Sequence, residues 1–146
     1  MGIIGHMDDD KNTRETLGAN LIERGYVYVG TDSVLGLLSL IRTKGSDIDL
    51  ILIDQKMSPQ KGSDIVPTIL NTYAALQRSD KEKYAKRPPI VLCSGEDEAG
   101  LALIAKQCGA DGHLNKGLLS GSQQLFDMFY QRIDSYAKHG LTKKPA

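Results

Sequence analysis

The sequence predicts an α/β fold: a single doubly wound sheet of five parallel strands in the order 2-1-3-4-5, within a three-layer α/β/α arrangement. Short apolar runs alternate along the chain with segments of helical periodicity, which is typical of parallel strands joined by crossover helices. Four of the runs end on polar, reactive residues, namely Asp8, Asp54, Ser94 and Lys116. Ligands of an open parallel sheet bind beyond the carboxyl ends of its strands, so these side chains are expected to gather at one edge.

Five segments carry the pattern of a strand. The runs at 49–53 and 90–93 contain consecutive large apolar residues, so both faces of these strands are expected to be covered by helices. The β-prone residues at 26–30 predict a shorter strand. The full set of predicted strands is 3–7, 26–30, 49–53, 90–93 and 113–115.

Five segments between and after the strands carry helical signals. Asn12 and Glu15 form a capping-box pattern at the start of the first helix, and Ser120 and Gln123 form another at the start of the last. Pro67 is acceptable in the third helix only near its first turn. The predicted helices are, within a residue or two, 12–24, 31–44, 63–75, 98–108 and 120–136.

Length and composition limit the class of protein. The 146 residues suit one domain, predicted at 1–138 and followed by a basic C-terminal tail at 139–146. Eighteen Lys and Arg balance eighteen Asp and Glu, which argues against direct nucleic-acid binding, since that needs surplus positive charge. Neither a membrane span nor a signal peptide is present, so a cytoplasmic protein is expected. Cys93 and Cys108 lack metal-site spacing and are expected to be reduced core residues.

Acidic residues after the first and third predicted strands point to a metal site. Asp8, Asp9 and Asp10 follow the first strand, and Asp54 follows the third. Carboxylates gathered there repel one another unless a cation lies among them. Mg²⁺ prefers oxygen ligands and is commonly held by one or two carboxylates. The Asp triplet alone fits a solvated helix-entry loop equally well; together with Asp54, it favours a magnesium site.

Asp54 is also a candidate nucleophile, since aspartyl phosphates are known covalent intermediates. A phosphoryl group on Asp54 needs its outer oxygens neutralised, and a metal ion, the Lys116 ammonium and the Ser94 hydroxyl together supply this. Taken singly, Ser94 is more typical of a turn and Lys116 of a solvated strand end. Their occurrence together, each at the end of a strand, favours a phosphoryl site.

These residues resemble the receiver domain of two-component response regulators, which has a flavodoxin-like (CheY-like) fold. The resemblance covers about residues 3–136 and rests on four motifs, at 7–10, 50–62, 92–95 and 109–116. It implies that Asp54 accepts a phosphoryl group from a phosphohistidine on a sensor histidine kinase or a histidine phosphotransfer protein. It also implies Mg²⁺ bound by Asp8, Asp9, Asp54 and the backbone carbonyl of Lys56, with Asp9 as a direct ligand.

The resemblance assigns roles to three further residues: Ser94 is the switch hydroxyl, Lys116 pairs with the phosphate, and His113 occupies the switch-aromatic position. It implies a phosphoacceptor rather than an enzyme, with at most self-phosphorylation from small donors and self-dephosphorylation. The fourth helix, fifth strand and fifth helix form the surface expected to select a protein partner. The partner of this surface is open between a downstream protein, a second copy of the chain in a homodimer and an output domain absent from this chain. The sequence also leaves open whether the chain is a stand-alone regulator or a piece of a longer protein.

Several positions depart from the family pattern. Ser58 stands where the family has a proline, and Pro59 follows one position later. Gly117 follows the site lysine in place of a cis-proline, and His113 replaces the usual Tyr or Phe. The segment 72–87 is longer and more charged than is typical, and is either an extension of the third helix or a solvated insertion.

Two side chains are candidates for setting the lifetime of the phosphoryl group. Lys56 and Glu96 lie two residues beyond Asp54 and Ser94, on either side of the path of a hydrolytic water. Their opposite charges would let them pair across the site entrance. We hypothesise that this pairing hinders water and slows self-dephosphorylation.

Three other functions share parts of this pattern. The departures at Gly117, His113 and Ser58 slightly favour a receiver-like interaction module that is not phosphorylated. The presence of Asp9, Asp54, Ser94 and Lys116 opposes this alternative. A phosphatase with an aspartyl nucleophile usually has a second Asp two residues later, where this chain has Lys56. A flavin-binding module is disfavoured, because the first loop is acidic where a phosphate cradle needs Gly, Ser or Thr.

Overall fold

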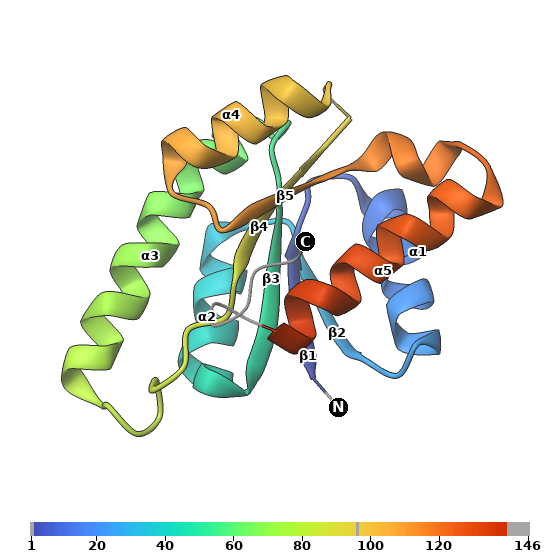
Figure 1. Cartoon of the computed structure of the whole chain (residues 1–146). Coiled ribbons are helices and arrows are strands. Elements are labelled where there is room, and N and C mark those ends of the chain that lie inside the picture. Colours follow the sequence, from blue (N-terminus) through green and yellow to red (C-terminus); the bar gives the residue numbers. More distant parts are fainter. Residues whose placement is uncertain (1, 96, 140–146) are drawn as a thin grey trace.

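The computed structural model describes residues 2–95 and 97–139, so Glu96 and nearly all of the predicted basic tail at 139–146 lie outside the described residues. Five parallel strands form one sheet in the order β2-β1-β3-β4-β5, which confirms the predicted topology (Figure 1). The strands are β1 (Ile3–Met7), β2 (Val27–Thr31), β3 (Ile48–Asp54), β4 (Ile90–Ser94) and β5 (Gly112–Asn115).

Helices follow the strands in strict alternation, as the sequence predicted. They are α1 (Lys11–Glu23), α2 (Val34–Lys44), α3 (Gly62–Ser79), α4 (Glu98–Cys108) and α5 (Gln123–His139). Two short 3₁₀ helices, η1 (Gly45–Asp47) and η2 (Lys116–Ser120), were not predicted. In the part of the chain that the structure describes, no helix is both long and apolar enough to cross a bilayer.

Two apolar layers enclose the sheet. Helices α1 and α5 cover one face, and α2, α3 and α4 cover the other (Figure 1). Strand β3 supplies both layers, because successive side chains of a strand point to opposite faces. Leu50 and Leu52 face α1 and α5, whereas Ile51 and Ile53 face the other three helices, and all four are fully buried. This explains why β3 is a continuous apolar run rather than an alternating one.

Both predicted capping boxes were placed wrongly. Asp10, not Asn12, caps α1: its carboxylate accepts a hydrogen bond from the backbone N–H of Asn12 (3.1 Å). Ser122 directly precedes α5, and its Oγ accepts from the backbone N–H of Leu125 (3.3 Å). An N-cap needs an acceptor on the residue just before the first helical turn, and here that residue is not the one that the spacing rule selects.

Pro67 lies inside α3, at its sixth residue, and not near the first turn as expected. The helix nevertheless continues to Ser79, although the proline lacks the N–H that would bond to the carbonyl of residue 63 and its ring crowds that carbonyl.

The charged segment 72–87 combines helix with an anchored turn. Its first part extends α3 to Ser79, which agrees with one of the two interpretations left open. The second part is not simply solvated, because Tyr84 is only 4% exposed and belongs to the core beneath α2 and α3. The Tyr84 hydroxyl donates a hydrogen bond to the carbonyl of Arg42 in α2 (3.0 Å), and the Ser46 N–H donates to the carbonyl of Lys83 (3.0 Å).

We expect Tyr84→Phe to lower the free energy of unfolding by about 1 kcal/mol, since the buried Arg42 contact loses its donor while the ring stays in place. Urea unfolding measures the change. Lys81→Ala, an exposed substitution in the same segment, is the matched control and should alter stability by less than about 0.5 kcal/mol. Equal effects of the two substitutions would show that Tyr84 does not anchor the segment.

Candidate functional site

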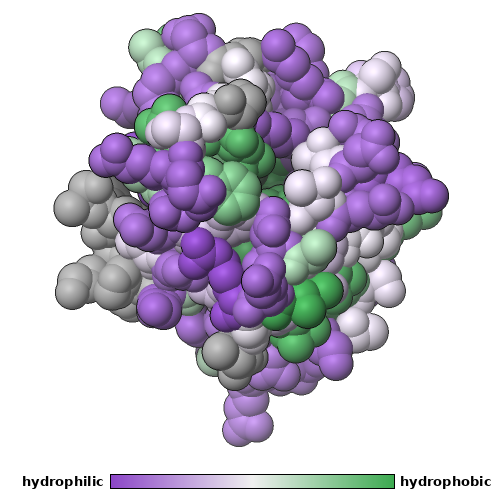
Figure 2. Space-filling model, turned by 90° about the vertical axis from the view of Figure 1, so that its right-hand side faces the viewer, coloured by the Kyte–Doolittle hydropathy of each residue, from purple (hydrophilic) through white to green (hydrophobic). Residues whose placement is uncertain are grey.

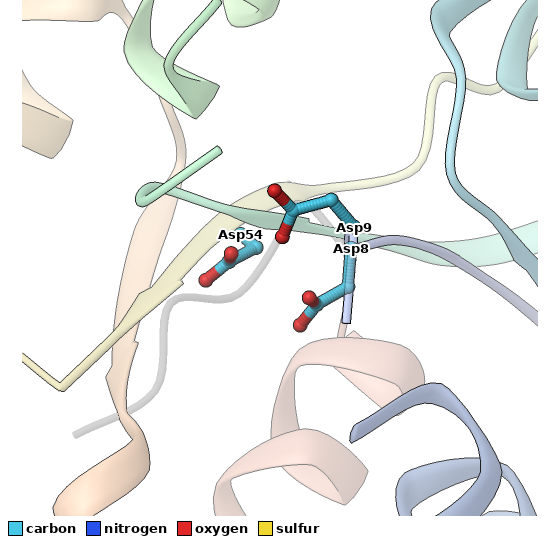
Figure 3. A group of neighbouring side chains, drawn as sticks. All are labelled: Asp8, Asp9 and Asp54. Atoms are coloured by element: carbon cyan, nitrogen blue, oxygen red, sulfur yellow. The ribbon is translucent and has the colours of Figure 1, made fainter. Parts of the chain in front are cut away.

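The carboxyl ends of β1 and β3 bring three carboxylates together. Asp8 and Asp9 directly follow β1, and Asp54 is the last residue of the neighbouring strand β3. One carboxylate oxygen from each lies within 4.8 Å of those of the other two, with Asp8 and Asp54 buried and Asp9 exposed (Figure 3). These are the three acidic residues that the sequence assigned to a metal. Asp10, the last of the acidic triplet, instead caps α1.

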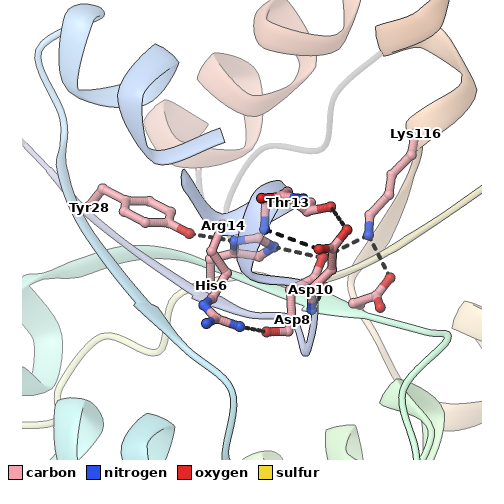
Figure 4. Close-up of polar contacts among 9 residues, drawn as sticks. His6, Asp8, Asp10, Thr13, Arg14, Tyr28 and Lys116 are labelled. Carbon is pink, nitrogen blue, oxygen red and sulfur yellow. Dashed lines mark hydrogen bonds and ion pairs between the residues drawn. The ribbon is translucent and has the colours of Figure 1, made fainter. Parts of the chain in front are cut away.

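Lys116 reaches two of these carboxylates from the end of β5. Its Nζ lies 2.7 Å from Asp54 Oδ1 and 2.8 Å from Asp8 Oδ2, and its side chain is 23% exposed (Figure 4). The turn after Lys116 is held by the side chain of Asn115, which accepts a hydrogen bond from the Gly117 N–H (2.7 Å). One ammonium is therefore shared between two buried carboxylates.

The protein environment affects the three charged groups differently. Burial raises the pKa of Asp8, but interactions with His6 and Lys116 outweigh it and bring the pKa to about 2. For Asp54 burial dominates, and its pKa is raised despite the hydrogen bond from Lys116. Burial lowers the pKa of Lys116, but its hydrogen bonds to both carboxylates raise it further. Of the two buried carboxylates, the negative charge of Asp54 is therefore less well stabilised by its surroundings than that of Asp8.

The ionised form of Asp8 is expected to stabilise the metal-free fold. Its pKa of about 2 in the folded state lies below the ordinary value of 3.8. A lowered carboxyl pKa contributes stability that is fully present above about pH 4 and lost as the pH falls through about 2, here about 2 kcal/mol. Urea unfolding across this pH range measures the loss. In Asp8→Asn, the free energy of unfolding should fall by about 2 kcal/mol less over this pH range than it does in the wild type. An equal fall in the wild type and the variant would show that Asp8 is not the group responsible.

Ser94 lies at the same edge of the sheet. It is the last residue of β4, is 1% exposed, and pairs with Asn115 of β5 in the strand register. The preceding residue, Cys93, pairs with Asp54. Ser94 therefore lies one residue further along its strand than the partner of Asp54.

Lys56 and His113 are two further residues that the sequence assigned to the site. Lys56 is exposed in the loop after β3. Its predicted partner Glu96 lies outside the described residues. The imidazole of His113 in β5 is 25% exposed, and its Nε2 lies 2.7 Å from Glu98 Oε1 at the start of α4. Glu98 is also 3.6 Å from Arg132 Nη1, so His113 belongs to a polar contact that joins β5, α4 and α5.

Sequence reasoning missed the residues that hold the loop after β1. Arg14 Nη1 donates to the carbonyl of Asp8 (2.6 Å), and the Asp10 N–H donates to Asp8 Oδ1 (2.9 Å). Thr13 Oγ1 donates to Asp10 Oδ2 (2.8 Å), so a side chain in the first turn of α1 is hydrogen-bonded to the loop after β1 (Figure 4). These contacts link residues up to six apart, and no spacing rule points to them.

A cavity of about 280 Å³ lies between α1 and α5, beside Lys116. Apolar side chains such as Leu17 and Phe129 form much of its wall, and His6 also borders it. The surface on this side of the molecule is mainly hydrophilic, with smaller apolar patches between the polar groups (Figure 2).

The carboxylate cluster fits a hard divalent cation. Its three donor atoms are all carboxylate oxygens within 4.8 Å of one another, the donor type that Mg²⁺ prefers. Lys116 supplies a single positive charge against Asp8, Asp9 and Asp54, so the cluster retains excess negative charge. A bound cation would offset this excess.

Comparison with known proteins agrees with the fold. A family model described as the response regulator receiver domain matches residues 4–129. A search of curated proteins found no match.

Solved structures with this fold include a two-component response regulator from Clostridium difficile, with 20% identity, a TM-score of 0.70, and coverage of 94% of this chain and 97% of that one. The chemotaxis protein CheY4 of Vibrio cholerae shows 20% identity and a TM-score of 0.65, with coverage of 91% and 98%. The response regulator TrrA of Thermotoga maritima, solved in complex with Mg²⁺ and BeF, shows 21% identity and a TM-score of 0.60, with coverage of 92% and 97%. Because the family match spans most of its length, this chain belongs to the response regulator receiver domain family.

Proposed function

We propose that this chain is the phosphoacceptor of a two-component system. A carboxylate oxygen of Asp54 attacks the phosphorus of a phosphohistidine on a sensor histidine kinase or histidine phosphotransfer protein. The P–N bond breaks, its electron pair leaves with the imidazole, and an aspartyl phosphate forms. The observation that carries the proposal is the shared contact of Lys116 Nζ with Asp54 Oδ1 and Asp8 Oδ2, which keeps a positive charge beside the nucleophile.

The site residues divide the work of stabilising the phosphoryl group. Asp9 and Asp54, with Asp8 and the Lys56 carbonyl, would hold Mg²⁺, which when bound neutralises charge on the phosphoryl oxygens. The acidic cluster supports this assignment, as does the TrrA structure with Mg²⁺ and BeF. Lys116 pairs with a second phosphoryl oxygen, and the Ser94 hydroxyl donates a hydrogen bond to a third.

The switch would pass from Ser94 to the surface of α4, β5 and α5. A phosphoryl oxygen is a stronger acceptor for Ser94 than the unmodified carboxylate, so the loop before α4 would move towards it. His113 in the switch position, tied to α4 through Glu98, would respond to that movement. A downstream protein, a second copy of this chain or an output domain outside it are the partners open to this surface.

Two finer assignments belong to the same proposal. Lys56 and Glu96 would flank the path of a hydrolytic water and lengthen the phosphoryl lifetime; the exposure of Lys56 in the loop after β3 supports its part. We also infer a cytoplasmic location, because Cys93 and Cys108 are free thiols, as a reducing compartment would keep them.

Intact-mass analysis after incubation with Mg²⁺ and acetyl phosphate tests the function. The protein should gain the mass of one phosphoryl group, and the gain should be lost when a chelator removes the metal. No gain from acetyl phosphate or from a phosphorylated histidine phosphotransfer protein would favour the alternative function, a receiver-like interaction module that is not phosphorylated.

Magnesium is expected to stabilise the fold through Asp9. At about ten times its Kd, Mg²⁺ should raise the free energy of unfolding by about 1.4 kcal/mol, because it binds the folded state alone. Asp9→Asn should remove most of this increase, as measured by urea unfolding with and without the ion. Asp10→Asn makes the same charge change one residue later, in the α1 cap, and should keep the increase. Equal losses in the two variants would place the ion elsewhere.

A further inference from the structure

His6 is a fully buried polar residue in a strand that is otherwise apolar. It lies in β1, two residues before Asp8, and no part of it is exposed. One ring nitrogen, Nδ1, lies 2.7 Å from the Tyr28 hydroxyl, and the other, Nε2, lies 3.6 Å from Asp8 Oδ2 (Figure 4). The Nδ1 contact is a hydrogen bond, whereas Nε2 faces Asp8 without a hydrogen-bond partner among the described residues. A buried imidazole nitrogen left unpaired costs free energy, so its position beside Asp8 needs a reason.

The contacts of His6 continue into the candidate phosphoryl site. Asp8 Oδ2, the oxygen that faces His6, also accepts the 2.8 Å hydrogen bond from Lys116 Nζ. Lys116 in turn lies 2.7 Å from Asp54 Oδ1. A line of polar contacts therefore runs from Tyr28 on the edge strand β2, through His6 and Asp8, to the proposed nucleophile.

Two glycines leave space for the Tyr28 ring at the start of this line. A Cβ at Gly18, in the middle of α1, would lie 2.6 Å from Tyr28 Cε2, and a Cβ at Gly30 in β2 would lie 2.6 Å from the Tyr28 hydroxyl. Glycine inside a helix costs about 1 kcal/mol relative to alanine, so Gly18 needs a packing reason. Gly18 is explained by its close contact with Tyr28, since a side chain at position 18 would clash with the tyrosine ring. Together, Gly18 and Gly30 leave the space in which Tyr28 lies against His6.

In the neutral His6 ring, the nitrogen that faces the Asp8 carboxylate is the one expected to carry the proton. The Tyr28 hydroxyl is protonated at neutral pH, and burial raises its pKa further, so it can donate to Nδ1 or accept from it. When that hydroxyl donates to Nδ1, the neutral ring carries its proton on Nε2 and directs it at Asp8. The opposite tautomer would turn a nitrogen lone pair towards the Asp8 carboxylate, which is unfavourable.

We propose that His6 is a positioning residue of the metal site, and that Tyr28 holds it in the tautomer that fixes the Asp8 carboxylate. Asp8 is held by the Asp10 N–H at one oxygen and by Lys116 at the other, and His6 restrains that second oxygen from within the sheet. Removing a group that orients a metal ligand from behind typically weakens metal binding by about 10–100-fold. The proposal rests on the proposed function only for the identity of the ion.

Calorimetric titration of the full chain with Mg²⁺ tests the proposal. Tyr28→Phe and His6→Leu should each weaken Mg²⁺ binding by about tenfold. His6→Gln keeps an acceptor for Tyr28 and a donor for Asp8, so it should retain affinity better than His6→Leu. Tyr26→Phe is the matched control, since it removes a hydroxyl hydrogen-bonded to Asp134 near the amino end of β2, and it should not change Mg²⁺ affinity.

Nitrogen-15 NMR of the His6 ring gives a second readout that needs no metal. The wild-type protein should show the Nε2–H tautomer, and Tyr28→Phe should show a larger share of the Nδ1–H tautomer than the wild type. The Nδ1–H tautomer in the wild type would overturn the proposal, as would unchanged Mg²⁺ affinity in both Tyr28→Phe and His6→Leu. If the wild type binds no Mg²⁺, the magnesium site of the proposed function fails, while the tautomer still decides whether Tyr28 and His6 act on Asp8.

Discussion

Asp54→Asn is expected to abolish phosphoryl uptake, both from acetyl phosphate and from a phosphorylated histidine phosphotransfer protein. An amide oxygen is a far weaker nucleophile than a carboxylate, while the side-chain volume is nearly unchanged, so the site keeps its shape. Lys116 can still donate to the amide oxygen at the position where it now contacts Asp54 Oδ1 (2.7 Å). The loss should therefore be chemical and not a result of unfolding. Intact-mass analysis in Mg²⁺ measures it.

Asp47→Asn is the matched control for this substitution. Asp47 is exposed in η1, which precedes the amino end of β3, so the same charge is lost far from the site. This variant should gain the phosphoryl mass as the wild type does. Continued uptake by Asp54→Asn would show that another carboxylate, such as Asp8 or Asp9, accepts the group.

Lys116→Met should destabilise the metal-free protein by about 3 kcal/mol. The substitution leaves the buried carboxylates of Asp8 and Asp54 without their shared counter-charge, and breaking a buried pair typically costs about 3–5 kcal/mol. The lower end applies because the Lys116 side chain is 23% exposed. Mg²⁺ should recover a large part of the loss, since a bound cation offsets the same two charges.

Urea unfolding with and without Mg²⁺ measures both effects of this substitution. Lys106→Met removes an exposed ammonium from α4 and should alter stability by less than about 0.5 kcal/mol. A Lys116→Met loss below about 1 kcal/mol would mean that the two carboxylates do not depend on this ammonium. A loss that Mg²⁺ does not reduce would mean that the ion binds away from Asp8 and Asp54.

The main features of the fold and site could be predicted from local sequence patterns. The continuous apolar run of β3 indicates a strand covered on both faces, and alternation of strands with helices predicts the observed strand order. Once that order is known, the strand ends determine which polar residues meet. The topology brings Lys116 to the same edge as Asp8 and Asp54, across separations of 108 and 62 residues, but its direct contact with both carboxylates was not predicted.

Contacts that depend on side-chain packing could not be predicted in the same way. Whether Asp10 caps α1 or joins the metal ligands depends on where the first helical turn begins, and several residues offer an acceptor. The burial of Tyr84 depends on how the segment after α3 folds back against α2. The charged residues on either side of Tyr84 in the sequence suggest a solvated segment instead.

The line from Tyr28 to Asp8 left a weak signal in the sequence. His6 is the one ionisable residue of β1, and Gly18 interrupts the middle of a helix. Each is unfavourable by itself. Only the packing of α1 over the edge strand shows that they belong together, because Gly18 makes room for the tyrosine that contacts His6.

Chemical mapping of the phosphorylated residue is the most informative single measurement. Borohydride reduces an aspartyl phosphate to an alcohol, and peptide mass spectrometry then identifies the altered position. After incubation with Mg²⁺ and acetyl phosphate, the alteration should be found at Asp54 alone. A protein that takes up the phosphoryl group with Asp54 intact, and with the label on Asp8, Asp9 or a residue outside the carboxylate cluster, would contradict the assignment of Asp54 as the acceptor.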